Sequence, residues 1–218
     1  MRVPGARAMR HAAALAVLAF LAGCDGLVGD GTHSLSVSDG KVVVAGPPGF
    51  CIDPEASHPE ATAPFILLGS CAAITGQQTT DTPTSRAVLT AVISAGAAGG
   101  TVAGSERELT GYFRSPEGRK ALSRSGNAQT VRVLGISHVD GVMVIHARDT
   151  SAFPGQAVAP DYWRALFDLN GHIVALSVIS VPQAPFTDTA GLHLLEQFVS
   201  AVRGASPGAA PAAAAPTG

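Results

Sequence analysis

Two short turns in the second half of the chain constrain its fold more than any other feature. Asp140-Gly141 and Asn170-Gly171 each stand between two runs rich in β-branched and other apolar residues, within the segments 130–149 and 161–180. A two-residue hairpin of type I′ needs positive φ at both central residues, which Asn, Asp and Gly tolerate best. Two such hairpins in succession predict a four-stranded antiparallel meander.

The last apolar segment has the period of an amphipathic helix. We expect this helix to begin near Asp188, which can cap it, and to end at Gly204. Its apolar residues fall on one face at helical spacing, and they are Leu192, Leu195, Phe198, Val199 and Val202. A helix with one apolar face should lie across the sheet.

Two short helices are expected before the meander. Ser105 and Glu108 have the spacing of a capping box, and Ser115-Pro116 places proline at the first position of a second helix. Three earlier strands are expected at 41–45, 65–69 and 86–94. The pattern indicates an α+β fold: an antiparallel sheet with a four-stranded meander, short helices before it, and an amphipathic C-terminal helix packed on the sheet. This element order resembles the PsbP/Mog1-type fold, a likeness that implies no residue roles.

The N-terminus has the features of an export signal. Three arginines precede an apolar run at 12–23, which ends in Leu21-Ala22-Gly23-Cys24. The run is too short to span a bilayer, which takes roughly 20 residues, and has the usual length for a signal peptide. Leu21 to Cys24 resembles the lipobox of bacterial lipoproteins. The resemblance implies cleavage before Cys24 and diacylation of its thiol. Asp25 resembles the inner-membrane retention signal of enteric bacteria.

The chain therefore divides into four expected segments. They are a lipoprotein signal peptide at 1–23, a lipidated flexible tether at 24–40, a single α+β domain at 41–204 and a disordered Pro/Ala tail at 205–218. Two or three acyl chains hold a protein stably on a membrane. We expect the protein to be anchored by lipid to the cell membrane, on its periplasmic side.

The charge of the mature chain narrows the range of partners. Removal of 1–23 leaves 11 basic and 16 acidic residues, a formal net charge of −5. A mildly acidic protein is a poor binder of nucleic acid or anionic lipid surfaces. We expect a membrane attachment through lipid, an envelope protein as partner, and neither nucleic acid nor nucleotide.

Cys51 and Cys71 remain as a pair once Cys24 is assigned to lipid. Export delivers the chain to an oxidising space, where paired thiols usually become disulfides. A bridge between them would close a loop of about 20 residues, worth roughly 3 kcal/mol in the chain-entropy model. The alternatives are a redox pair or half of a metal site, although a CxxC spacing is absent and no histidine adjoins either cysteine in the sequence.

The loop Gly46-Pro47-Pro48-Gly49 follows the first expected strand and invites comparison with a phosphate-binding loop. A P-loop needs lysine, a hydroxyl residue and backbone N–H donors. Here lysine and hydroxyl are missing and two prolines remove donors. We therefore interpret the loop as a turn held by the disulfide, and reject an ATPase function. The block VAGPPGFCID…FILLGSC is similar to a group of uncharacterised bacterial lipoproteins, which implies no activity.

No catalytic, cofactor or metal residues are predicted. The mature chain has six histidines, and His193 with Glu196 places two potential ligands on one helical face, but a zinc site needs three or four converging ligands. No GxSxG motif is present. The carboxylate pairs Glu106/Glu108 and Asp53/Glu55 lie where caps and loops are expected. The histidines are His33, His58, His138, His146, His172 and His193.

Two surface features offer binding sites. Tyr162 and Trp163 are neighbours in a strand, so we expect one in the core and the other exposed. Basic residues concentrate in the helical segment, as a solvated face or a docking surface: Arg107, Arg114, Arg119, Lys120 and Arg124.

We expect a non-enzymatic binding or accessory lipoprotein of the cell envelope. The alternatives are a lipoprotein that binds a small hydrophobic ligand between sheet and helix, and a hydrolase whose site the sequence does not reveal.

Overall fold

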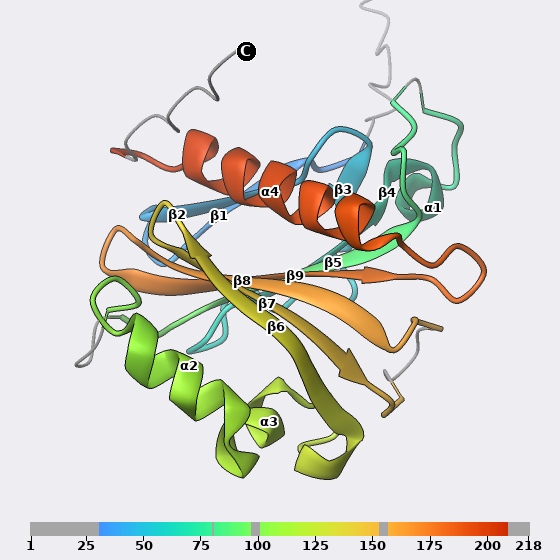
Figure 1. The fold of residues 1–218 in the computed structure, drawn as a ribbon. Helices are drawn as coiled ribbons and strands as arrows, with labels where there is room; N and C mark the ends of the chain where they lie inside the picture. Colours follow the sequence, from blue (N-terminus) through green and yellow to red (C-terminus); the bar gives the residue numbers. More distant parts are fainter. Residues whose placement is uncertain (1–30, 80, 97–100, 153–156, 209–218) are drawn as a thin grey trace, which may run out of the picture.

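A computed structural model describes residues 31–79, 81–96, 101–152 and 157–208. Its centre is a seven-stranded antiparallel sheet with structure packed on both faces (Figure 1). The strands in spatial order are β3 (Phe50–Ile52), β4 (Phe65–Ser70), β5 (Ala87–Ile93), β9 (His172–Ser180), β8 (Asp161–Leu169), β7 (Val142–Asp149) and β6 (Val131–Val139). The expected α+β class is confirmed. The expected signal peptide, Cys24, the expected tether up to 30 and the expected tail from 209 lie outside the described residues.

The meander is present as the two turns predict. Strands β6 to β9 are consecutive neighbours in the sheet. Asp140 and Gly141 have φ of 50° and 71°, and Asn170 and Gly171 have φ of 50° and 80°, which is the left-handed geometry of these turns. Strand β5 pairs along its whole length with β9, and this pairing joins the N-terminal strands to the meander.

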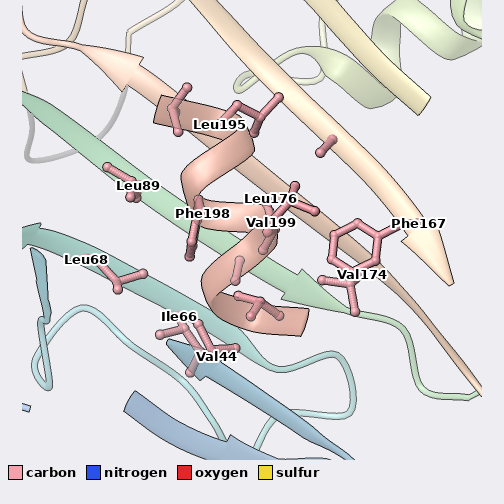
Figure 2. Packing of buried hydrophobic residues seen from close by; sticks show 14 of the residues in the cluster. Val44, Ile66, Leu68, Leu89, Phe167, Val174, Leu176, Leu195, Phe198 and Val199 are labelled. Atoms are coloured by element: carbon pink, nitrogen blue, oxygen red, sulfur yellow. The ribbon is translucent and has the colours of Figure 1, made fainter. Parts of the chain in front are cut away.

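The helix α4 (Asp188–Ala205) covers one face of the sheet. Figure 2 shows Leu195, Phe198 and Val199 of this helix packed among apolar side chains of the strands. A hairpin of β1 (Ser34–Val37) and β2 (Val42–Ala45) packs into the same core, beside α4 (Figure 1).

The expected start of α4 at Asp188 is confirmed, whereas its capping residue and its C-terminal end differ from the expectation. Thr187 rather than Asp188 caps the helix, with its hydroxyl accepting from the Ala190 N–H at 3.2 Å. The helix continues through Gly204, because the following Ser206 is buried and its hydroxyl accepts from the Val43 N–H at 3.0 Å. This contact ties the end of α4 to β2, so the segment expected to be a disordered tail is ordered up to 208.

Two helices, α2 (Glu106–Arg114) and α3 (Pro116–Leu122), cover part of the opposite face with a second apolar cluster (Figure 1). Pro116 stands at the first position of α3, as predicted, and the Ser115 hydroxyl caps the helix by accepting from the Gly118 N–H at 3.1 Å. The capping box expected at Ser105 is not formed, since its side chain makes no cap hydrogen bond. Instead the Glu106 carboxylate accepts from the Gly104 N–H at 3.0 Å, which satisfies a donor just before the helix.

Four short elements escape sequence reasoning. The strand β1 was expected to be tether, the strand β3 and the helix α1 (Cys71–Thr75) were expected to be loop, and the 3-10 turn η1 (Ala128–Thr130) was not expected. β1 lies within the Gly/Ser/Asp-rich segment 25–40, which was expected to be a tether, but it pairs with β2 as a strand. The expectation of a tether over the whole of 24–40 is therefore wrong for the residues of this hairpin.

Candidate functional site

The strand β6 forms one edge of the sheet, and a groove of about 660 Å³ runs along it. Successive residues from Gln129 to Gly135 line this groove, so the groove follows the strand itself. Its walls come from the junction of α2 and α3 on one side and from β7 on the other. An edge strand offers unpaired backbone donors and acceptors to a further strand. We call this surface the β6 groove.

Four arginines line the β6 groove, two on each side of the sheet. Arg132 and Arg148 are partners in the β6–β7 ladder and therefore share a face. This is the α4 face, because Val144, which lies an even number of residues from Arg148 on β7, belongs to the core beneath α4. Arg114 and Arg119 come from the helices that cover the opposite face. A segment lying along β6 would meet positive charge on both of its sides.

Two acidic residues, Asp161 and Glu117, offset part of this charge. Arg148 Nη1 lies 2.8 Å from Asp161 Oδ2, in an exposed ion pair across β7 and β8. Arg119 Nη1 donates to the Arg114 carbonyl oxygen at 2.6 Å, which holds the Arg119 guanidinium at the end of α2. Arg132 is exposed and has no carboxylate partner among the described residues. In the described part of the chain, no carboxylate oxygen lies within 4.0 Å of the Arg114, Arg119 or Arg132 guanidinium, although Arg119 acts electrostatically on Glu117.

A β-bulge interrupts the ladder between Val133 and Gly135. Leu134 stands in this bulge and is 45% exposed, which is unusual for a leucine on a strand of this sheet. It also lines a second groove, of about 450 Å³, on the α4 face. Leu134 and Arg148 belong to both grooves, so the two form one continuous surface.

Trp163 lines the second groove. Its ring stacks on the His146 ring, with centroids 3.9 Å apart and planes 8° from parallel. Asp188 at the start of α4 lies 4.0 Å from His146 Nε2. Phe186 adds a further aromatic side chain. We call this surface the Trp163 groove.

The neighbouring Tyr162 faces the other side of the sheet, as strand alternation predicts. Tyr162 is buried beneath α3, and its hydroxyl donates to the Leu122 carbonyl oxygen at 2.9 Å. Burial raises the pKa of this phenol. The prediction that one aromatic residue is core and the other lines a surface is confirmed, with Trp163 half-buried rather than fully exposed.

One of the five basic residues expected on the helical face has a different role. Arg124 is nearly buried, and its Nε lies 3.2 Å from Asp149 Oδ2. Burial acts to raise the pKa of Asp149, but hydrogen bonds from the N–H groups of Arg124 and Ser151 outweigh it and lower this pKa. Arg124 therefore joins the end of α3 to the end of β7 and is not available to a partner.

Most histidines lie apart from one another. His138 is opposite Met143 and His146 is opposite Gly135, as the turn geometry predicts. His138 Nε2 lies 3.0 Å from Thr110 Oγ1, and His172 Nδ1 donates to the Ser94 carbonyl oxygen at 2.8 Å. The expected pair on α4 is present as an exposed contact, with 3.9 Å between His193 Nδ1 and Glu196 Oε2.

The predicted disulfide between Cys51 and Cys71 is present, and it links β3 to the first residue of α1. The Gly46–Gly49 loop is a turn beside it: the Phe50 N–H donates to Pro47 O at 3.0 Å, and the Cys71 N–H donates to Gly49 O at 2.9 Å. His33 also reaches both sulfur atoms, although it is far from either cysteine in the sequence. Sequence reasoning missed this contact because it depends on the unexpected strand β1.

The expected carboxylate pairs serve local structure. Asp53 Oδ1 accepts from the N–H groups of Glu55 and Ala56 at 2.9 and 3.0 Å, which closes a turn after β3. Among the described residues, no serine hydroxyl is hydrogen-bonded to a histidine ring. No helix in the same part of the chain has the length and apolar character needed to cross a membrane.

No protein family, no curated protein and no solved structure matches this chain. Its function must therefore be inferred from the geometry of its own surfaces.

Proposed function

We propose that this protein is a non-enzymatic, lipid-anchored accessory protein on the periplasmic side of the cell membrane, and that it docks an acidic, extended segment of an envelope protein along β6. The anchor is proposed from the lipobox at Leu21 to Cys24. The docking site is proposed from the β6 groove, whose open strand edge is bordered by arginines on both faces.

The position of the arginines carries this proposal. An added β-strand pairs its backbone with an edge strand and points successive side chains to opposite faces. Carboxylates on one side of such a segment would meet Arg132 and Arg148, and those on the other side would meet Arg114 and Arg119. Arginine binds carboxylates through two parallel hydrogen bonds, which adds directional specificity to the charge. The exposed Leu134 offers an apolar contact in the middle of the groove.

The topology of the sheet favours a protein partner over the lipid surface that holds the anchor. The segment that follows the tether runs beside β3, where the Ile52 N–H donates to Thr32 O at 2.7 Å. β3 and β6 are the two opposite edges of the seven-stranded sheet. At an interstrand spacing of about 4.8 Å, these edges are roughly 29 Å apart. A tether entering at β3 therefore leaves the β6 groove free to meet another protein.

Site-specific photocrosslinking in cells tests the docking surface. A photoreactive amino acid at Leu134 should crosslink to a discrete protein, and mass spectrometry should map the crosslink to an acidic segment. Charge reversal at Arg132 and Arg119 together should remove this product. Arg107→Glu is the matched control, because Arg107 is exposed on α2 but does not line the groove. An unchanged crosslink in the charge-reversed protein, or one mapped to a neutral or basic segment, would refute the docking site.

A small hydrophobic ligand is the second candidate, and the Trp163 groove suits it better than the interface between α4 and the sheet. The interface between α4 and the sheet is filled by apolar side chains, as Figure 2 shows for Phe198, Leu176 and Leu89. The Trp163 groove, of about 450 Å³, is within the size range of small-molecule sites. Trp163 is the only tryptophan of the chain, so its fluorescence reports directly on this groove. Native mass spectrometry of protein from membranes should show a bound molecule whose removal changes this fluorescence; an empty domain would exclude this candidate.

A further inference from the structure

The described residues bring three side chains with metal-binding atoms together beside the disulfide. His33, Cys51 and Cys71 each place one ligand atom within 4.8 Å of the other two. His33 Nδ1 lies 3.7 Å from Cys51 Sγ and 3.8 Å from Cys71 Sγ. Both cysteines are buried, whereas His33 is exposed, so the imidazole covers the bridge from the solvent side.

A backbone carbonyl determines which ring nitrogen of His33 is free. His33 Nδ1 lies 3.3 Å from the Phe50 carbonyl oxygen, which can only accept a hydrogen bond. Nδ1 therefore carries the proton in the neutral ring, and Nε2 keeps its lone pair. Nε2 lies 3.9 Å from Cys51 Sγ. Histidine ligands of metals usually donate their second N–H to a carbonyl or carboxylate in this way.

Backbone contacts hold the three residues in place independently of the sulfur–sulfur bond. The Gly46 N–H donates to His33 O at 2.9 Å, and this bond keeps the histidine beside the loop. Cys51 pairs with Gly69 in the β3–β4 ladder. The Cys71 N–H donates to Gly49 O at 2.9 Å. The side chains should therefore stay close together after the bridge is reduced.

We propose that reduction of the Cys51–Cys71 bridge creates a site for Zn²⁺, with Cys51 Sγ, Cys71 Sγ and His33 Nε2 as ligands. A dithiol donor would transfer two electrons and two protons to the bridge, and would itself become a disulfide. Each cysteine thiol then releases one proton as its sulfur binds the metal. This inference rests on the bridge and His33 alone and is independent of the proposed docking function.

The ligand set and the distances fit zinc. Two thiolates and an imidazole are ligands that Zn²⁺ prefers, whereas Mg²⁺ and Ca²⁺ require oxygen. Bonds of about 2.3 Å to sulfur and about 2.05 Å to nitrogen, at a tetrahedral angle, separate these ligand atoms by about 3.6 Å. His33 Nε2 is already near that distance from Cys51 Sγ, whereas the nitrogen near Cys71 Sγ is Nδ1. Zinc binding therefore needs a rotation of the imidazole as well as separation of the two sulfurs. The exposed side at His33 leaves the fourth position to water.

Zinc titration of the reduced protein tests this site. The full chain would be used in a Cys24→Ser background, so that the thiol of Cys24 contributes nothing, and reduced with a phosphine under argon. The reduced protein should bind one Zn²⁺ per chain in competition with a chromophoric chelator, and the oxidised protein should bind none at this site. Substitution by Co²⁺ should give thiolate-to-cobalt charge-transfer absorption.

Histidine variants distinguish zinc binding by all three residues from zinc binding by the two thiols alone. His33→Ala should weaken zinc binding at least about tenfold, since even loss of an outer hydrogen-bond partner costs 10–100-fold at metal sites. His193→Ala, at an exposed histidine on α4, should bind zinc as the parent does. Circular dichroism should show that the reduced protein remains folded before zinc is added. Equal affinity in His33→Ala, or zinc binding by unfolded protein alone, would overturn the proposal.

Discussion

The Arg124 guanidinium and the Asp149 carboxylate form a buried ion pair, with 3.2 Å between Arg124 Nε and Asp149 Oδ2. The Asp149 side chain is fully buried, and the Arg124 side chain is 9% exposed. The same Asp149 oxygen accepts from the Arg124 backbone N–H at 2.7 Å. These contacts join the end of α3 to the end of β7 and fix the helical segment to the meander.

Removal of the Asp149 side chain should therefore lower the free energy of unfolding strongly. Asp149→Ala leaves the Arg124 charge buried without its partner, and breaking such a pair typically costs about 3–5 kcal/mol. Asp161→Ala is the matched control, because its pair with Arg148 is exposed and should contribute less than about 1 kcal/mol. Urea unfolding of both variants measures the two losses of unfolding free energy. Similar losses of unfolding free energy would show that the buried pair stabilises the fold no more than the exposed pair does.

The contribution of Asp149 should also depend on pH. Hydrogen bonds from Arg124 and Ser151 lower its folded-state pKa against the effect of burial. A carboxyl group whose pKa is lower in the folded state stabilises the fold fully above its unfolded pKa of about 3.9. This stabilisation is lost as the pH falls through the folded pKa. Unfolding free energies from pH 7 to pH 2 should show the advantage of the wild type over Asp149→Ala shrinking below about pH 4. An advantage that stays constant over this range contradicts the prediction.

Two glycines in α4 should respond to alanine in opposite ways. A Cβ atom at Gly191 would lie 2.5 Å from the Trp163 ring, so Gly191→Ala must displace the helix or the indole. Overpacking of this kind costs about 1–3 kcal/mol. A Cβ atom at Gly204 meets nothing within 4 Å, so Gly204→Ala should gain about 0.5–1 kcal/mol of helix stability. Thermal unfolding with Trp163 fluorescence as the signal measures both. A neutral Gly191→Ala would mean that α4 does not rest on Trp163.

The lipid anchor is tested at Cys24. Cys24→Ser removes the thiol that the lipobox places for acylation. The variant should be found as uncleaved or soluble protein, because an unmodified chain lacks the acyl groups that hold a protein on a bilayer. Cell fractionation with intact-mass measurement gives the location and the modification. Unchanged membrane association and size in the variant would refute the anchor.

The sequence predicted the elements whose signals are local. The two hairpins follow from φ preferences at Asp140-Gly141 and Asn170-Gly171, and α4 follows from the period of its apolar residues. The disulfide followed from counting cysteines in a chain expected to be exported, and the opposite faces of Tyr162 and Trp163 followed from strand alternation.

Only the tertiary structure decided the features that depend on pairing between distant residues. β1 lies within a segment that has the composition of a tether, and it becomes a strand because β2 supplies its partner. The sequence suggested that Arg124 is a surface charge, but its ion pair with Asp149 buries it. Arg114 and Arg132 line the same β6 groove because the helices pack beside an edge strand. His33 reaches the bridge for the same reason. Local propensities act within a few residues, whereas these contacts arise from the burial of apolar surface that closes the whole domain.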